Sequence, residues 1–161
     1  MRLWHYRLLP YLPRQQLLSQ WRECCCIAKS IAEKGTPNHI LVNKIMDYPI
    51  DHFVEYCYKI CIEMEHRGYR CDFSRIDRYL ETIAGVSRPP KISFERLDFY
   101  AALIALQRNG EQIFPEWHND IYLRECLYNL EEKFRAGGIP VDEWQVIYDR
   151  FKDFTPLWCG E

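Results

Sequence analysis

The feature that most constrains this chain is the spacing of its apolar residues, which recur every three or four positions along almost its whole length. Such spacing gives a helix one apolar face, whereas a strand needs strict alternation, and alternation is nearly absent. Proline stands where helices should begin, and glycine where they should end. The pattern predicts helices over residues 13–34, from Pro49 to Gly68, over 74–84, from Ser93 to Gly110, from Asn119 or Asp120 to Gly137, and over 141–152.

The size and composition of the chain fit one globular domain. It has 161 residues, of which 48% are apolar, enough for a core of its own. We find no linker between the periodic segments, so we expect one compact all-α domain over residues 1–161, a bundle of about six helices. No apolar run approaches the roughly 18 residues of a membrane span, and the first residues lack the apolar stretch of a signal peptide. We therefore expect no membrane contact and a cytoplasmic location.

Cysteine is unusually frequent, with eight residues in the chain, three of them consecutive at Cys24-Cys25-Cys26. Without an export signal, we expect reduced thiols that pack as small apolar groups. Cys57 and Cys61 are four positions apart and, with a histidine, have the spacing of zinc ligands. Both lie on an apolar stripe, however, and the chain has no Cys-x-x-Cys motif. We therefore expect core thiols, no metal site and no cofactor.

The charge is distributed unevenly along the chain. The first 45 residues hold seven Lys and Arg against two Glu, a net charge of +5. The whole chain carries −2, which leaves −7 on the remainder. A basic segment on an acidic body can present an anion-binding face.

Two neighbouring polar rows follow the predicted helix over residues 13–34, because residues three or four apart share one side of a helix. The first row holds Gln15, Ser19, Arg22 and Cys26, and the second holds Gln16, Gln20 and Glu23. Guanidinium groups suit phosphates and amides suit base edges, so these rows favour nucleic-acid contact. The alternative is a solvated helix face with Trp21 in the core.

These residues carry a resemblance to a known family. The run Leu12-Pro13-Arg14-Gln15-Gln16-Leu17-Leu18-Ser19-Gln20-Trp21-Arg22-Glu23 resembles the catalytic helix of the pyrimidine dimer DNA glycosylases. A second similar stretch begins at Asn38-His39 and continues through the helix that ends at Arg67-Gly68-Tyr69. The resemblance covers a glycosylase-like part, residues 1–75, and leaves residues 76–161 as additional helices. The family is compact and all-helical, which agrees with the periodicity.

The resemblance implies a bifunctional DNA repair glycosylase and abasic-site lyase. In this family the N-terminal α-amine attacks the sugar C1′ of the damaged nucleotide and forms an imine, and β-elimination then cuts the strand. Unperturbed α-amines have a pKa near 7.7–8.0, against about 10.4 for lysine, so an appreciable fraction is nucleophilic at pH 7. Glu23 matches the catalytic glutamate of the family. Because Arg2 is bulky, we expect Met1 to be retained and to supply the amine.

The resemblance also implies the DNA contacts. Arg22 and Gln15 match residues that contact DNA near the lesion, and Arg2 matches an arginine beside the nucleophile that would bind a phosphate. Arg14 lies at the basic start of the same helix. His39 matches a histidine close to the active helix of the family. These five residues are the predicted nucleic-acid-binding set.

Three positions differ from the family, with Gln16, Trp21 and Cys26 in place of a histidine, a tyrosine and an arginine. The expected partner is damaged double-stranded DNA, bound by a monomer without metal or cofactor. The alternative is a non-catalytic helical module that keeps the fold and binds nucleic acid or a protein. The acidic body and the missing arginine favour this alternative, whereas the adjacent Arg22 and Glu23 favour the enzyme.

Overall fold

A computed structural model of the chain describes residues 1–84, 109 and 111–154. Throughout these residues the regular secondary structure is helical, which confirms the all-α class. The α-helices are α1 (Arg14–Lys34), α2 (Asp51–His66), α3 (Ser74–Ala84), α5 (Asp120–Arg135) and α6 (Val141–Phe151). Three 3-10 helices accompany them, η1 (Tyr6–Tyr11), η2 (Asn43–Asp47) and η4 (Lys152–Phe154).

Each of these α-helices was predicted to within about two residues at both ends. The predicted helix from Ser93 to Gly110 lies outside the described residues. The 3-10 helices η1 and η2 were not predicted, because so short a helix shows no apolar period. Pro10 lies inside η1, and proline is normally taken as evidence against a helix interior, so it made this helix harder to predict.

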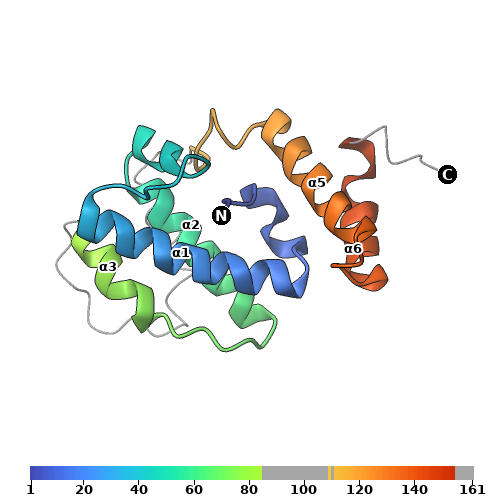
Figure 1. Ribbon diagram of the computed structural model, residues 1–161, viewed down its shortest axis with the longest axis horizontal. Coiled ribbons are helices and arrows are strands. Elements are labelled where there is room, and N and C mark those ends of the chain that lie inside the picture. Colours follow the sequence, from blue (N-terminus) through green and yellow to red (C-terminus); the bar gives the residue numbers. More distant parts are fainter. Residues whose placement is uncertain (85–108, 110, 155–161) are drawn as a thin grey trace.

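The N-terminal segment lies between two groups of helices (Figure 1). On one side α1 packs against α2 and α3. On the other side α5 and α6 form a pair in which the rings of Phe134 and Trp144 stack with their centroids 4.9 Å apart. Trp21 is buried in the core, as the alternative interpretation of the α1 face held, and so are Cys57 and Cys61. No helix in the described part of the chain is long and apolar enough to cross a membrane.

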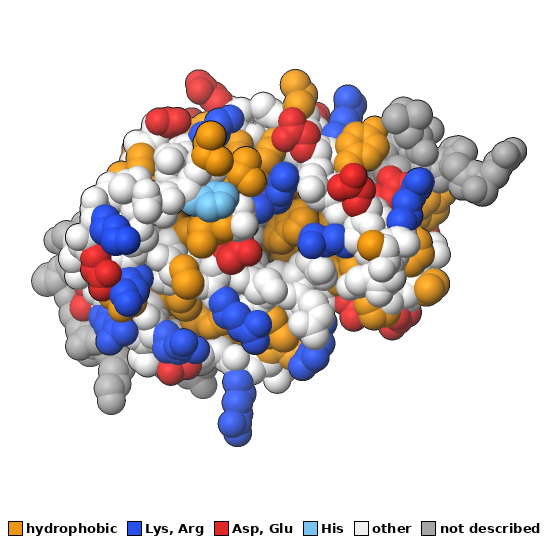
Figure 2. All heavy atoms as spheres, viewed as in Figure 1, with side chains coloured by type: hydrophobic (Ala, Val, Ile, Leu, Met, Phe, Trp, Pro, Cys, Tyr) orange, Lys and Arg blue, Asp and Glu red, His pale blue; other side chains and the backbone are white. Residues whose placement is uncertain are grey.

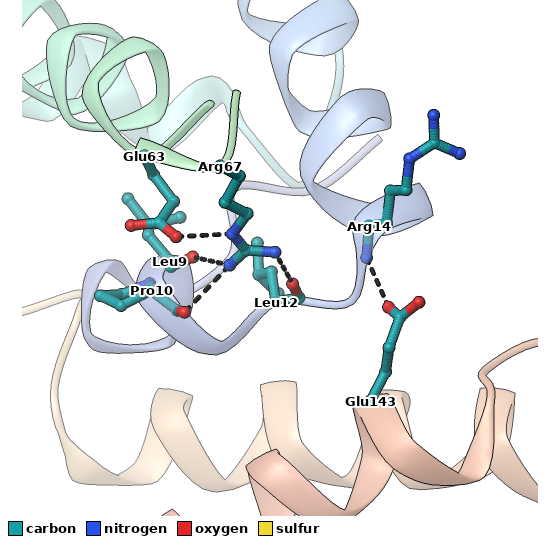
Figure 3. A network of polar contacts seen from close by, with 7 residues as sticks. All are labelled: Leu9, Pro10, Leu12, Arg14, Glu63, Arg67 and Glu143. Atoms are coloured by element: carbon teal, nitrogen blue, oxygen red, sulfur yellow. Dashed lines mark hydrogen bonds and ion pairs between the residues drawn. The ribbon is translucent and has the colours of Figure 1, made fainter. Parts of the chain in front are cut away.

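Arg67, just after α2, fixes the approach of the chain to α1 (Figure 3). Its guanidinium donates to the backbone carbonyls of Leu12 at 2.6 Å, Pro10 at 2.9 Å and Leu9 at 3.3 Å. Its Nε also donates to the Glu63 carboxylate at 2.6 Å. The Arg67 guanidinium therefore donates to three carbonyls at the end of η1, while the Glu63 carboxylate neutralises its charge. Arginine suits this role because its planar group carries several N–H donors in a fixed geometry.

The N-terminus of α1 is capped from a distant helix. The residue before it, Pro13, makes no side-chain cap. Instead, the Arg14 backbone N–H donates to a Glu143 carboxylate oxygen of α6 at 2.6 Å (Figure 3). A carboxylate here satisfies one of the unpaired N–H groups of the first turn and complements the helix dipole. This bond therefore joins the glycosylase-like part to the C-terminal helices.

We expect the substitution Arg67→Met to lower the free energy of unfolding by about 2 kcal/mol or more, because it leaves several half-buried acceptors without their charged donor. Urea unfolding followed by circular dichroism measures the loss. Arg70→Met, at an exposed arginine nearby, should change stability by less than about 0.5 kcal/mol. Equal losses in the two variants would contradict this role of Arg67.

Candidate functional site

Residues 1–5 form no helix, yet residues 3–5 are buried. Buried backbone N–H and C=O groups need hydrogen-bond partners, and here side chains supply them. From α1, a Glu23 carboxylate oxygen accepts from the Arg2 backbone N–H at 2.9 Å, and Gln20 Oε1 accepts from the Trp4 N–H at 2.8 Å. The row of Gln20 and Glu23 that the sequence placed on α1 therefore holds the N-terminus.

Three more side chains bind the N-terminal segment, one from α2 and two from α5 and the residues just before it. The Tyr56 hydroxyl donates to the Trp4 carbonyl at 2.7 Å, and the Tyr122 hydroxyl donates to the Leu3 carbonyl at 2.6 Å. His118 Nδ1 accepts from the Tyr6 backbone N–H at 3.1 Å. With the two groups on α1, these are the anchoring side chains: Glu23, Gln20, Tyr56, His118 and Tyr122.

His5 and His118 form a stacked pair of neutral imidazoles, with ring centroids 5.1 Å apart. His5 donates from Nε2 to the His118 carbonyl at 2.7 Å and accepts at Nδ1 from the Arg7 N–H, so both of its ring nitrogens are committed. Burial lowers the pKa of His5 to about 4 and the pKa of His118 well below its ordinary value. Both rings therefore stay uncharged at neutral pH.

The histidine pair predicts a loss of stability in acid. The pKa of a histidine is near 6.5 in the unfolded chain and about 4 for His5 in the folded protein, so unfolding takes up a proton between these values. Between pH 7 and 4.5 the stability of the wild type should fall by about 2 kcal/mol more than that of His5→Gln, whose amide can still donate to the His118 carbonyl. Urea titrations at the two pH values measure this difference.

Carboxylates also titrate in this window, so the comparison needs a matched variant. His66 lies exposed at the end of α2, and His66→Gln should lose as much stability in acid as the wild type does. An equal acid loss in wild type and His5→Gln would contradict the assignment to the buried pair.

Met1 and Glu23 are more exposed to solvent than the anchoring side chains Gln20 and His118 are. Met1 is 42% exposed, and Glu23 is half-buried. The first polar row of α1 is fully exposed, as its spacing predicted: Gln15, Ser19, Arg22 and Cys26. Lys and Arg side chains are spread over and around α1 on this face (Figure 2). The arrangement places a carboxylate and the chain terminus beside a basic surface.

The other predicted DNA-binding residues, Arg2, Arg14 and His39, differ in their exposure and in their contacts. Arg2 is half-buried, and its guanidinium lies 5.9 Å from the Trp4 ring centroid. It also lies beside Cys126, where burial raises the pKa of the thiol and the positive charge of Arg2 lowers it. Arg14 is exposed, and its guanidinium lies 5.5 Å from the Tyr69 ring centroid. His39 accepts from the Leu41 N–H through Nδ1, which gives it a structural role in the turn before η2.

The sequence did not single out four of the anchoring side chains. From their helical spacing, Tyr56 and Tyr122 would be expected to pack only as core aromatic residues, whereas their hydroxyls bind the N-terminal backbone. Gln20 was counted on a polar row although it is 1% exposed, and its Nε2 has no partner in the described residues. His118 was not considered. Both Gln20 and His118 adjoin a buried tryptophan in the sequence, but they stand among polar neighbours, so no local pattern marked them.

The cysteines lie mostly in the core. Burial raises the pKa of Cys57 and of Cys61 well above that of a free thiol and raises that of Cys25 to about 12, so these thiols stay protonated. Cys26 is exposed on α1. Among the residues that the structure describes, no three of His, Cys, Asp and Glu are placed to hold a metal ion.

Comparison with known proteins finds a family match over the N-terminal part of the chain. Residues 1–77 match the family described as pyrimidine dimer DNA glycosylase, which confirms the resemblance seen in the sequence. The matched part contains α1, α2, Glu23 and Gln20 and ends inside α3. No curated protein and no solved structure matches the chain. The match supports a role of the pyrimidine dimer DNA glycosylase type, which implies a DNA substrate.

Proposed function

We propose that this chain is a DNA repair glycosylase and abasic-site lyase, acting on pyrimidine dimers or abasic sites through an imine with its N-terminal α-amine. The proposal rests on the 2.9 Å hydrogen bond from the Arg2 backbone nitrogen to Glu23, which brings the chain terminus to a carboxylate. Imine chemistry needs both groups together, because the amine bonds to carbon while the carboxylate moves protons.

In the proposed reaction the neutral amine adds to the sugar C1′ and displaces the damaged base, or adds to the C1′ aldehyde of an abasic site with loss of water. In the first route the C1′–O4′ bond of the resulting amino sugar then breaks and O4′ takes up a proton, so that both routes give the same ring-opened cationic imine. Glu23 then removes a proton from C2′, the C3′–O bond breaks, and the 3′ phosphate leaves. Water finally hydrolyses the imine and regenerates the amine. A carboxylate beside the imine also stabilises its positive charge.

The identity of the amine follows from the first residue of the working protein. In a chain that begins with Met1, the Met1 amine is the nucleophile, one residue beyond the nitrogen that Glu23 holds. If Met1 is removed, the Arg2 nitrogen becomes a primary amine in direct reach of Glu23. We therefore expect both forms to react, and the form beginning at Arg2 to react faster.

The basic face over α1 would hold the DNA. Arg22 and Gln15 project from the exposed row next to Glu23, and Arg14 lies at the start of the same helix. The sugar carbon is hard to reach inside a duplex, so the damaged nucleotide would have to be turned out of the stack. His39 and Arg2 remain part of the proposed binding set.

Borohydride reduction tests the imine directly, because it converts the imine to a stable amine. Untagged protein is mixed with duplexes that carry an abasic site or a pyrimidine dimer, and mass spectrometry locates the adduct. We expect an adduct on the first residue, none after N-terminal acetylation, and strand cleavage reduced about 100-fold or more in Glu23→Gln. Proteins released from an N-terminal fusion to begin at Met1 or at Arg2 compare the two amines.

An exposed acid on the same helix provides the matched control. Glu33→Gln lies near the other end of α1 and should cleave like the wild type. If folded wild type gives no adduct with either substrate, the enzyme proposal is wrong. An adduct with the abasic duplex alone would keep the lyase and remove the dimer specificity.

Salt dependence tests the basic face independently of catalysis. Each phosphate contact releases a counterion, so we expect Arg22→Ala to weaken binding to every duplex and to reduce the slope of log affinity against log salt by about 1. Fluorescence anisotropy with an undamaged duplex measures both. Lys133→Ala, at an exposed lysine on α5, should leave the slope unchanged. A slope that is unchanged in Arg22→Ala would remove this residue from the interface.

The second candidate is a helical module that binds nucleic acid without chemistry. The observation in its favour is Cys26, exposed on α1 where the family has an arginine. This candidate predicts salt-dependent DNA binding with neither adduct nor cleavage.

A further inference from the structure

We propose that Tyr122 and His118 are positioning residues for the reaction, so that the segment around α5 forms part of the active site. This inference rests on the proposed function, since it assigns these residues the task of holding the N-terminal amine at Glu23. It also extends beyond the family match, which ends at residue 77.

The contacts act close to the amine. The Tyr122 hydroxyl donates at 2.6 Å to the carbonyl of Leu3, the residue that follows Arg2. His118 accepts from the Tyr6 N–H at 3.1 Å, and its own carbonyl accepts from His5 at 2.7 Å. The Arg7 guanidinium adds an ion pair with Asp120 at 3.2 Å. The segment from residue 118 to residue 122 therefore binds the chain at Leu3 and from His5 to Arg7.

α1 and α2 alone hold this segment from one side only. Gln20 and Tyr56 bind Trp4, and Glu23 binds the nitrogen of Arg2. Without a bond at Leu3, the terminal residues could pivot about Trp4 and carry the amine away from Glu23. Reacting groups need placement to within a fraction of an ångström, and a displacement of about 1 Å can cost roughly 100-fold in rate.

A purely structural role would have a different signature. A residue that only stabilises the fold changes the unfolded fraction and not the rate of the folded enzyme. A residue that positions the amine slows imine formation while leaving the basic DNA-binding face untouched. The two roles therefore separate in single-turnover experiments that measure the rate at saturation and the DNA concentration at half-saturation.

The test uses the full-length protein and a duplex with one abasic site, with borohydride trapping under single-turnover conditions. We expect Tyr122→Phe, which removes only the hydroxyl, to slow trapping at saturation about tenfold or more, with half-saturation within twofold of wild type. Tyr128→Phe, on the same helix at a more exposed tyrosine, is the matched control and should trap at the wild-type rate. Circular dichroism melts confirm that each variant is folded at the assay temperature.

His118 supplies a second pair of variants in case Tyr122→Phe does not fold. An asparagine oxygen can take the place of Nδ1 and accept from Tyr6, whereas leucine cannot. We expect His118→Asn to trap within about threefold of wild type and His118→Leu at least tenfold more slowly, with equal DNA affinity.

The outcomes separate the two proposals. If wild type forms no adduct, the proposed function fails. If wild type forms the adduct and the folded variants Tyr122→Phe and His118→Leu trap at the wild-type rate, the function stands and the positioning role is wrong. Slower trapping that is fully explained by weaker DNA binding would also overturn the positioning role.

Discussion

The rest of this structure depends on how the buried N-terminal backbone is satisfied. A chain that runs through the interior without helix or sheet must find a partner for each buried N–H and C=O, or lose free energy for each one left unpaired. Here the partners are the anchoring side chains, which come from α1, α2, the residues before α5, and α5 itself. These elements are far apart in sequence, and all of them bind the N-terminal segment. The same contacts therefore hold the segment in place and hold the elements in position relative to one another.

The start of α1 is held in the same long-range way. Arg67 binds the carbonyls that precede the helix, and Glu143 binds its first N–H group (Figure 3). Glu23 is presented from a helix whose N-terminal end is fixed by groups from α2 and α6. The proposed site, a chain terminus and one carboxylate, needs such rigidity, since neither group can be placed more accurately than the element that supports it.

The sequence could predict those features that depend on residues close together in the chain. Apolar period and terminal glycine or proline placed the α-helices, and the three- and four-residue spacing placed Gln15 and Arg22 on one row of α1 and Glu23 on the next, without predicting that only the first row is exposed. The resemblance then gave Glu23 its role. The bonds of Tyr122 to Leu3 and of His118 to Tyr6 join residues more than 110 positions apart, and no local pattern encodes such a pairing. The short 3-10 helix η1 shows no apolar period, and the donor for its carbonyls, Arg67, is likewise distant in sequence.

The chemistry of the anchoring side chains suits the cationic imine of the proposed mechanism. Apart from Glu23, they are an amide, two phenols and an imidazole that burial keeps neutral. Lysine or arginine in place of Tyr56 or Tyr122 could also donate to the backbone carbonyls, but would place a positive charge near the proposed imine and raise its energy. Neutral donors and acceptors fix the backbone without that penalty, and the Arg2 nitrogen itself is held by the Glu23 carboxylate. Neutral tyrosine, histidine and amide side chains around the N-terminal backbone therefore fit the proposed reaction, in which the chain terminus carries the positive charge.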